Sequence, residues 1–536
     1  MTNPPDPKLP ANKQGTVLPW LQRRLWIPLL IVGVALATRV VAADFDSAWA
    51  TVTLVILSVI GGVTLVSKWL RKTSRAHRWL FPVAGMTLIV TLLLSFRIDT
   101  FSGSLWPTFE PRWLTPHDES LNALSLSGQK LALSRSSPGD YHQFLGPLRD
   151  NSASHVKLNP DWKAHPPRRL WKRAVGAGWG GFSAVNGYAV TMEQRGPSEL
   201  VICYDIETGE THWSHAEKLR HESLLGGIGP RSTPTIDQGQ VFALGATGLL
   251  RCLDGATGNA IWQFDLLANY GISPAEESAA IAWGRSGSPL VTNDLVIIPA
   301  GGSQQKRVSL VALNRTNGQI VWEGGNSQVS YASPSLVTLA GVPQILIVNE
   351  NSVTAHDPSS GELLWSHPWT GSSSSNASVS QALAATESSV LLSKGYGIGA
   401  ELLQLEMGDN RQIQVHSLWA SSRVMKTKFT NACLHGGYAY GLSDGVLECI
   451  EISSGRRVWK RGRFGHGQLL RVDDLLLVQA ESGEIVLVEA NSQRFQQLGS
   501  IPALEGQTWN NLCLYKNRLL ARNAREATCF SLTIQP

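Results

Sequence analysis

From about residue 168 to the C-terminus, short runs of hydrophobic residues are interrupted by turn residues. Residues 200–204 and 248–253 are two such runs, rich in the branched and aromatic residues that favour extended chain. Alternating or continuous apolar runs of this length are typical of short strands, and the glycine-containing sequences between them mark turns. The pattern therefore predicts an all-β domain of many short strands.

Pairs of runs are joined by a repeated turn sequence. An acidic or amide residue is followed by a Thr-Gly, Ser-Gly or Asn-Gly pair and, eight residues after the first position, by tryptophan. The copies are Asp205 with Trp213, Asp254 with Trp262, Asn314 with Trp322, Asp357 with Trp365 and Glu451 with Trp459, and a degenerate copy runs from Glu406 to Trp419. The first side chain can accept backbone N–H groups, and glycine can adopt the positive φ of the reversal. We therefore expect capped hairpins whose tryptophans pack between neighbouring repeats.

A second element separates the hairpins, and a short apolar strand and turn follow it. Its copies are Ser-Thr-Pro at 232–234, Ser-Pro at 288–289 and 333–334, and Gly-Phe-Ser at 181–183. Four strands per unit, repeated about every 45–50 residues, predict the blades of a β-propeller.

The number of units predicts eight blades, with seven as the alternative. Six units carry the tryptophan, and residues 483–489 begin a seventh unit without it. The eighth appears in two pieces, because 170–172 form an outer strand with no preceding partner and 517–533 supply strands and then end. Pairing the N- and C-terminal strands would close the ring of four-stranded blades.

Three apolar segments precede the repeats, at residues 25–43, 47–67 and 79–96. Each is about long enough for a helix to cross a hydrocarbon layer about 30 Å thick. Basic residues precede the first segment and fill the connection between the second and third. By the positive-inside rule, residues 1–24 form a cytoplasmic tail, and the chain after the third span lies on the periplasmic side of the inner (cytoplasmic) membrane.

The first apolar segment also fits a cleaved signal peptide. Arg23 and Arg24 resemble a positive n-region, and Val41-Ala42-Ala43 resembles a cleavage site. Cleavage would leave two spans with the same final sidedness, so both interpretations place the repeats outside the cytoplasm.

Residues 97–167 are rich in proline and predict a partly ordered stalk, after which the propeller occupies residues 168–536. Trp106 and Trp113 follow the third span closely and are expected at the membrane interface. An amphipathic pattern over 119–133 predicts a short helix.

Composition narrows the class of partner. Only 16% of residues are charged, and the formal net charge of +5 is small for 536 residues. This balance gives no support to nucleic acid as a partner. The 50 glycines and 19 tryptophans suit tightly turned β structure.

The Asp-x-x-Thr-Gly turn followed by tryptophan resembles the PQQ-type propeller repeat, which quinoprotein dehydrogenases and BamB-like envelope proteins share. The resemblance covers about residues 141–536. The lead-in sequences are similar to those of a bacterial group of PQQ-like propeller proteins: Tyr141 to Pro147, Arg149-Asp150-Asn151, Gly178-Trp179-Gly180 and Glu193 to Gly196. The resemblance is specific for the fold and is weak evidence for a cofactor.

For the dehydrogenases, the resemblance implies PQQ over a tryptophan, calcium held by Glu, Asn and Asp, a catalytic Asp and, in several members, adjacent cysteines. This chain has no Cys-Cys pair. One repeat position holds either cysteine or alanine, which predicts a small core site. It is Cys203, Cys252, Cys449 and Cys529 in some copies, and Ala312 and Ala355 in others. The repeat carboxylates are distributed one per blade, so they favour turn capping over a calcium site. We expect no cofactor or metal, with PQQ and calcium as the alternative.

The best remaining site candidates are polar and aromatic residues in the segments that lead to inner strands, where a propeller has its channel mouth. Arginine and aromatic side chains give large contact areas at binding surfaces. The candidate binding face consists of Trp179, Glu193, Gln194, Arg195, Arg231, Trp283, Arg285, Tyr331, Lys428, His466, Trp509 and Asn510.

Together these patterns favour a membrane-tethered, periplasmic propeller that acts as a non-catalytic binding or scaffold module. Its expected partners are the lipid bilayer and an envelope protein or polymer, and the sequence leaves the oligomeric state open. The first alternative is a PQQ-dependent membrane oxidoreductase. The second is hydrolysis or sensing of carbohydrate or peptide at the channel mouth.

Overall fold

The computed structural model describes residues 94–535 apart from 128–130, 136, 303–306, 373–375 and 411. The chain divides into two compact units, Met1–Ser95 and Phe96–Pro536, and the second holds all the described strands. The predicted spans 25–43, 47–67 and 79–96 lie outside the described residues, except for the last three residues of the third. In the part of the chain that is described, no helix is long and apolar enough to cross a bilayer.

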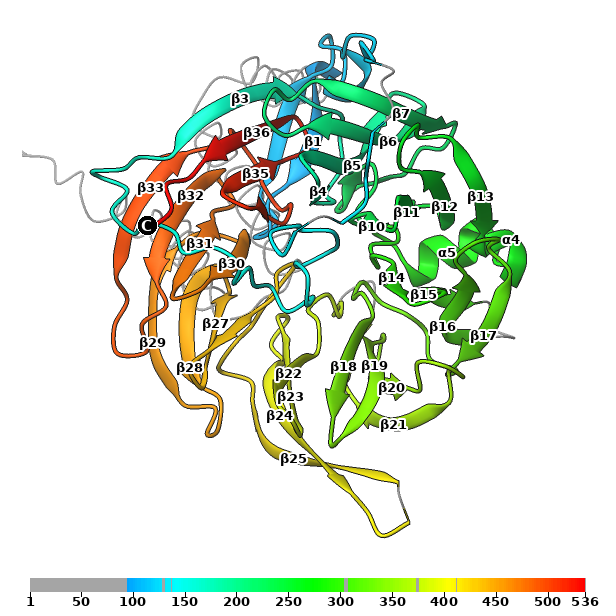
Figure 1. The fold of residues 1–536 in the computed structure, drawn as a ribbon, viewed down its shortest axis with the longest axis vertical. Helices are drawn as coiled ribbons and strands as arrows, with labels where there is room; N and C mark the ends of the chain where they lie inside the picture. The colour runs from blue at the N-terminus through cyan, green and yellow to red at the C-terminus, as the bar shows by residue number, and fades with distance from the viewer. Residues whose placement is uncertain are drawn as a thin grey trace, which may run out of the picture. The chain divides into compact units, whose positions relative to one another are not determined.

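Eight four-stranded antiparallel sheets surround a central axis as the blades of a propeller (Figure 1). Blade 1 contains β4 (Ser183–Val185), β5 (Tyr188–Arg195), β6 (Ser198–Asp205) and β7 (Thr211–Glu217). Blade 2 contains β10 (Thr235–Asp237), β11 (Gln240–Leu244), β12 (Leu249–Asp254) and β13 (Ala260–Asp265). Blade 3 contains β14 (Leu290–Thr292), β15 (Leu295–Gly302), β16 (Arg307–Asn314) and β17 (Ile320–Gly324). The eight-bladed prediction is confirmed, and the seven-bladed alternative is wrong.

The next four blades continue the same order from inner to outer strand. Blade 4 contains β18 (Ser335–Leu339), β19 (Val342–Val348), β20 (Ser352–His356) and β21 (Leu363–Pro368). Blade 5 contains β22 (Leu383–Thr386), β23 (Ser389–Lys394), β24 (Gly399–Met407) and β25 (Ile413–Ser421). Blade 6 contains β26 (Cys433–His435), β27 (Tyr438–Ser443), β28 (Val446–Glu451) and β29 (Arg457–Arg463). Blade 7 contains β30 (Gln468–Val472), β31 (Leu475–Gln479), β32 (Glu484–Glu489) and β33 (Gln497–Pro502).

Blade 8 closes the ring with strands from both ends of the propeller. It contains β34 (Cys513–Tyr515), β35 (Arg518–Arg522), β36 (Glu526–Ser531) and, outermost, β3 (Arg168–Ala174). Trp171 of β3 lies opposite Cys529 of β36, the register that Trp213 and Cys203 have in blade 1. The predicted closure is therefore confirmed, and Trp171 is the tryptophan of the eighth blade.

Each repeat tryptophan lies on an outermost strand and packs against the next blade. The indole N–H of Trp213 donates to the carbonyl of Gly255 at 2.9 Å, and its ring lies against Gly258. Equivalent bonds join Trp171 to Ile206, Trp262 to Arg315, Trp419 to Ile452 and Trp459 to Asn491. The turn glycine therefore leaves room for the ring of the neighbouring blade, besides reversing the chain.

The first residue of the repeat caps its own turn, as predicted. One carboxylate oxygen of Asp205 accepts the backbone N–H groups of Glu207 and Thr208, both at 2.8 Å. Hydrogen bonds from the hydroxyl and backbone of Ser359 hold the pKa of Asp357 below its usual value. These carboxylates are therefore occupied locally, one in each turn.

Replacing Gly258 by alanine is expected to lower the free energy of unfolding by about 1–3 kcal/mol. Its φ is +76°, and a Cβ there would come within 2.5 Å of the Trp213 ring. Gly271 is the matched control, because its φ is +61° but nothing lies within 4 Å of a Cβ. Urea denaturation of both alanine variants measures the difference. Equal midpoints would contradict a steric role for the tryptophan.

Blade 7 lacks the repeat tryptophan, and a residue from outside the repeats takes its place. Gly499 of β33 lies opposite Leu487 of β32, the register that holds tryptophan in other blades. Trp162 covers this glycine, with its Cβ 2.8 Å from where a Cβ of residue 499 would lie, and is 6% exposed. The segment before the propeller therefore completes the core of blade 7.

Neighbouring blades are also joined near the axis. The backbone N–H of Gly181 donates to the hydroxyl of Thr233, that of Thr233 to the hydroxyl of Ser288, and that of Ser288 to the hydroxyl of Ser333, each at 2.9 Å. The Ser-Thr-Pro and Ser-Pro elements of the sequence therefore supply hydrogen bonds between successive blades, ahead of each inner strand.

Residues 141–153, the axial segment, run across the centre of the ring. The segment makes polar contacts with five blades: Tyr141 with Ala184, His142 with Ile236, Arg149 with Ser288 and Pro289, Asn151 with Asn431, and Ala153 with Arg471. Arg149 is buried, and burial lowers its pKa to about 9. The lead-in motif of the sequence therefore occupies the propeller axis.

Much of the region predicted as a stalk is packed on the ring. It begins with a hairpin of β1 (Phe96–Phe101) and β2 (Pro107–Pro111), followed by a 3-10 turn, η1 (His117–Glu119). The helix predicted over 119–133 is wrong, because Leu126 instead bridges Thr211 of β7 in an extended conformation. Further on, hydrophobic side chains are buried, among them Leu133, Tyr141, Leu145 and Leu158. The described part of this region is therefore an ordered layer of the propeller unit.

Candidate binding face

The connections between blades gather at one end of the ring, which we call the loop face. In a four-stranded antiparallel meander, the second turn and the connection to the next blade leave from the same end. The longest connections carry the hairpin of β8 (Glu222–Ser223) and β9 (Gly227–Ile228) before blade 2, and α4 (Leu266–Tyr270) and α5 (Pro274–Ala280) before blade 3. The opposite end, the turn face, carries the capped repeat turns.

Four of the predicted binding-face residues belong to one aromatic cluster on the loop face. The ring of Trp179, before blade 1, lies 4.9 Å from that of Trp509, before blade 8. Trp283, before blade 3, stacks on Tyr331, before blade 4, at 5.0 Å. Phe429, before blade 6, joins the two pairs, with its ring 5.1 Å from Trp509 and 5.9 Å from Trp283. Aromatic contacts of this kind stabilise a folded chain by about 0.5–1.5 kcal/mol each. Because the five rings precede five different blades, the cluster links these blades.

The predicted cations near this cluster are held by neighbouring groups. The guanidinium of Arg231 donates to the carbonyls of Gly226 and Gly227 at 2.7 and 2.9 Å, and burial lowers its pKa to about 9. The ammonium of Lys428 lies 5.3 Å from the centre of the Tyr396 ring, within range of a cation–π contact. These two cations are therefore held in fixed positions, and Lys428 is buried.

The other predicted residues make bonds inside the ring. The buried carboxylate of Glu193 accepts the backbone N–H of Gly176 at 2.7 Å and the guanidinium N–H of Arg195 at 3.1 Å. The rest are likewise bonded: Gln194 to Gly196 and Leu219, Arg285 to Glu277 of α5, and Asn510 to Gly178 and Gly180. The structure therefore does not join Glu193, Gln194 and Arg195 to the aromatic cluster, and they connect blade 1 to its surroundings.

Sequence reasoning missed Phe429, the residue that joins the cluster. Its ring also lies 6.1 Å from the ring of His466, a predicted residue before blade 7. Phe429 directly follows Lys428 and adopts a φ of +53°. Its place before an inner strand is the same signal that identified Trp179 and Trp283.

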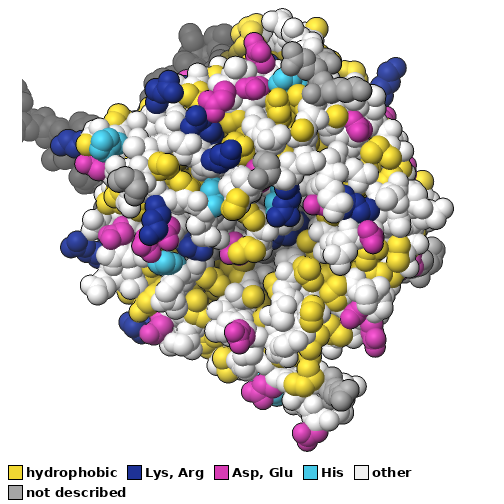
Figure 2. All heavy atoms as spheres, in the orientation of Figure 1, with side chains coloured by type: hydrophobic (Ala, Val, Ile, Leu, Met, Phe, Trp, Pro, Cys, Tyr) yellow, Lys and Arg dark blue, Asp and Glu magenta, His cyan; other side chains and the backbone are white. Residues whose placement is uncertain are grey.

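Figure 2 shows positive and negative side chains interspersed on the face that it draws. Nucleic-acid interfaces need a continuous basic surface along the phosphate backbone. The drawn face has no such single-sign stripe, in line with the small net charge of +5.

The ring has two hollows, and Arg195 of the predicted binding face lines the larger of them. One of about 610 Å³ lies between residues 121–127, β3 and the turn at 208–211. The other, of about 450 Å³, lies beside α5 and is lined by Glu276, Arg307 and Glu350. Both are at blade margins, whereas residues of the axial segment and the aromatic cluster occupy the central region.

Comparison with known proteins identifies the family. The PQQ-repeat family described as outer membrane protein assembly factor BamB matches residues 164–279 and 197–461, which together span more than half of the chain. The chain belongs to this family. A curated relative, outer membrane protein assembly factor BamB of Yersinia pestis, is 24% identical over 384 residues, covering 60% of this chain and 88% of the relative.

Solved dehydrogenase structures share the fold of this BamB-family ring. A europium-containing methanol dehydrogenase has a TM-score of 0.55 and 12% identity, covering 74% of this chain and 99% of that chain. Quinohemoprotein alcohol dehydrogenase from Comamonas testosteroni has a TM-score of 0.53 and 12% identity, covering 74% and 81%. At such identities the likeness shows the propeller fold alone.

Two features of this BamB-family ring bear on PQQ with calcium. Among the described residues, no three His, Cys, Asp or Glu side chains come together as metal ligands. Trp179 and Trp509, two tryptophans on which a quinone could stack, already pack on each other. All six cysteines are free and buried, and burial raises the pKa of Cys433 to about 12. The prediction that cysteines fill core positions is therefore confirmed.

Proposed function

We propose that this BamB-family chain is a membrane-tethered, periplasmic propeller that binds or scaffolds envelope proteins or polymers without catalysing a reaction. The observation that carries the proposal is the filled centre of the ring. The axial segment contacts five blades, and the aromatic cluster joins five connections on the loop face. A ring reinforced in this way offers a preorganised surface, which reduces the entropy cost of binding.

The family and the N-terminal sequence support the proposed partners and location. The Yersinia pestis relative is, by its name, an outer membrane protein assembly factor. The three apolar segments and the basic residues around them favour a tether in the inner membrane, with the propeller outside the cytoplasm. Protease added to spheroplasts should therefore digest the propeller. Protection from protease until the membrane is permeabilised would reject this location.

A partner on the loop face should be captured by site-specific photo-crosslinking in cells. Trp283 is half-buried in the aromatic cluster, so a photoreactive side chain there reports on the loop face. Leu363, exposed at the start of β21 beside a capped turn, gives a matched probe for the turn face. The proposal expects a crosslinked envelope component from position 283, and the same products from both positions would count against it.

Reconstitution with PQQ and calcium is expected to give no dye-linked alcohol or sugar dehydrogenase turnover and no rise in melting temperature. The reason is that no three His, Cys, Asp or Glu side chains of the described residues come together and that Trp179 and Trp509 already pack on each other. A ligand at 100 times its Kd would stabilise the folded chain by about 2.7 kcal/mol, which a thermal melt detects. A quinoprotein dehydrogenase treated in parallel is the control. Turnover or a clear shift would favour the PQQ-dependent oxidoreductase instead.

A further inference from the structure

The β1–β2 hairpin exposes hydrophobic side chains on one of its two faces. Ile98 and Phe109 lie opposite each other in the register and are 43% and 62% exposed. Trp113, which is 69% exposed, packs on Phe96 at 5.9 Å. Trp106, in the hairpin turn, is 50% exposed. A contiguous apolar surface of this kind marks an interaction site, because a hairpin on a soluble ring usually turns its apolar face inward.

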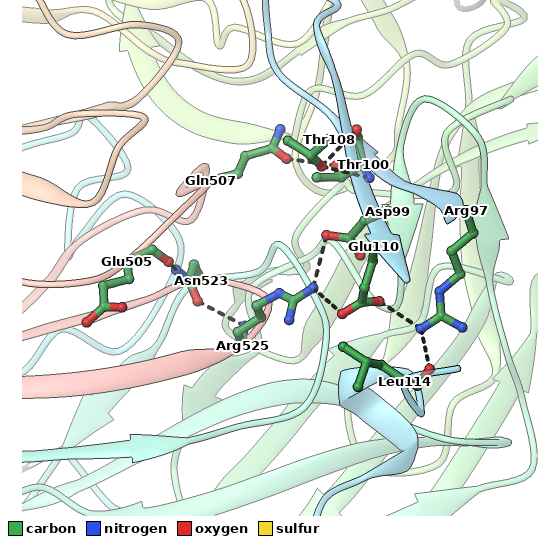
Figure 3. Close-up of polar contacts among 10 residues, drawn as sticks. All are labelled: Arg97, Asp99, Thr100, Thr108, Glu110, Leu114, Glu505, Gln507, Asn523 and Arg525. Carbon is green, nitrogen blue, oxygen red and sulfur yellow. Dashed lines mark hydrogen bonds and ion pairs between the residues drawn. The ribbon is translucent and has the colours of Figure 1, made fainter. Parts of the chain in front are cut away.

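The polar groups of the hairpin are bonded to blade 8 instead (Figure 3). Arg97 pairs with Glu110 across the hairpin at 2.7 Å, and Arg525, in the turn between β35 and β36, bridges Asp99 at 3.0 Å and Glu110 at 3.3 Å. Burial alone would lower the pKa of Arg525, but these two carboxylates raise it. The guanidinium therefore remains charged between the carboxylates.

Further hydrogen bonds attach the hairpin at two more points. The hydroxyl of Thr100 donates to Gln507 at 2.7 Å, as Figure 3 shows, and the amide of Gln507 donates to the carbonyl of Phe101 at 2.7 Å. The backbone N–H of Gly103 donates to Glu481, in blade 7, at 2.6 Å. Three attachment points on two blades fix the orientation of the hairpin relative to the ring.

Chain continuity indicates which partner covers the apolar face. β1 begins at Phe96, the last residue of the third predicted span, and Ile98 is two residues further, about 7 Å along an extended strand. Tryptophan and other aromatic residues concentrate at the level of lipid headgroups. The neighbouring hairpin, whose strand β9 contacts β1, adds exposed Leu224 and Leu225. The apolar face therefore begins where the chain is predicted to leave the bilayer.

We propose that residues 96–114 form a lipid-contacting bracket. The face of Ile98, Phe109 and Trp113 lies in the headgroup region of the outer leaflet, and the bonds of the bracket hold blades 7 and 8 next to the membrane. The inference rests on the membrane tether of the proposed function, and adds that the ring has a fixed orientation on the lipid surface. A flexible stalk would leave that orientation free.

The bracket is tested on the full chain in phosphatidylcholine nanodiscs, with and without doxyl-labelled lipid. A cysteine that replaces Phe109 carries the fluorophore NBD, and the six native cysteines are buried, so they are protected from labelling. NBD at position 109 is expected to emit at shorter wavelength than in water and to lose emission when doxyl lipid is present. Leu363→Cys, an exposed site on the turn face, is the control and is expected to show neither change.

Each outcome separates the bracket from the tether. If alkaline carbonate extracts the full chain from cell membranes, the tether of the proposed function fails. If the chain stays in the membrane but NBD at position 109 behaves as in water, only the bracket fails. NBD that is shielded in native membranes but unaffected by doxyl lipid in nanodiscs indicates a protein cover and overturns the lipid assignment.

A second variant tests whether the bracket orients the ring. Arg525→Gln removes the cation that bridges Asp99 and Glu110. With NBD at Leu224→Cys on the neighbouring hairpin, this variant is expected to show less doxyl quenching than the parent, while NBD at position 109 keeps its quenching. Unchanged quenching at position 224 would contradict the orienting role. A thermal melt confirms that the ring of the Arg525→Gln variant remains folded.

Discussion

Replacing Glu199 by alanine is expected to lower the free energy of unfolding by about 3–5 kcal/mol. Glu199 of β6 and Arg251 of β12 form an ion pair between blades 1 and 2, and their side chains are 1% and 0% exposed. Without the carboxylate, the buried guanidinium loses its ion-pair partner, and the backbone N–H of Ala246 loses its acceptor. Thermal and urea denaturation of the purified full chain measure the loss.

Two further variants show whether the loss comes from the unpaired charge. Glu362→Ala removes an exposed glutamate in a blade 4 turn and is expected to change stability by less than about 0.5 kcal/mol. The double variant Glu199→Leu with Arg251→Met replaces both ions by apolar groups of similar size and is expected to be more stable than Glu199→Ala alone. A double variant less stable than Glu199→Ala would show that the ion pair itself is strongly favourable.

The ring was predictable from sequence because each blade carries its own local signal. The turn acid, the glycine and the tryptophan lie within one hairpin, so every copy reports the same geometry independently of the others. Even the divided eighth blade was recognisable, since Trp171 and the strand of Cys529 are incomplete units at opposite ends of the repeat region. The structure adds the reason for the spacing, because the turn glycine of one blade lies against the tryptophan of the preceding one.

The candidate binding face was predictable only in part. Position before an inner strand correctly brought Trp179, Trp283 and Trp509 to one face, because topology sends all such segments to the same end. Burial was not predictable, because it depends on partners far away in the sequence. Glu193 illustrates this, since a charged residue that looks exposed in sequence is buried under the hydroxyl of Tyr204 and the backbone of Gly176.

The region of 96–167 was the hardest part to predict. Its prolines suggest a linker, and the one amphipathic pattern in it, over 119–133, predicts a helix that does not form. Its order comes from long-range contacts, such as Arg149 with Pro289 and Arg525 with Asp99, which no local rule contains. A segment of this kind is recognised only once the surface that it covers is known.

Replacing Trp162 by alanine is expected to lower the free energy of unfolding by about 3–5 kcal/mol, the usual cost of removing a buried tryptophan. The side chain is 6% exposed and belongs to the hydrophobic core that blades 7, 8 and 1 share. It also covers Gly499, so its loss leaves a cavity at the point where other blades carry their own tryptophan. Urea denaturation followed by circular dichroism measures the change.

Moving the tryptophan from the lead-in segment to the strand distinguishes this role from general core packing. Gly499→Trp alone is expected to destabilise the chain, because Trp162 already fills the space beside that position. The double variant Trp162→Ala with Gly499→Trp restores the register of tryptophan on an outermost strand, as in Trp213 opposite Cys203. The two losses are therefore expected to be non-additive, with the double variant more stable than their sum predicts by at least about 1 kcal/mol. Additive losses would mean that Trp162 does not act as the missing tryptophan of the seventh blade.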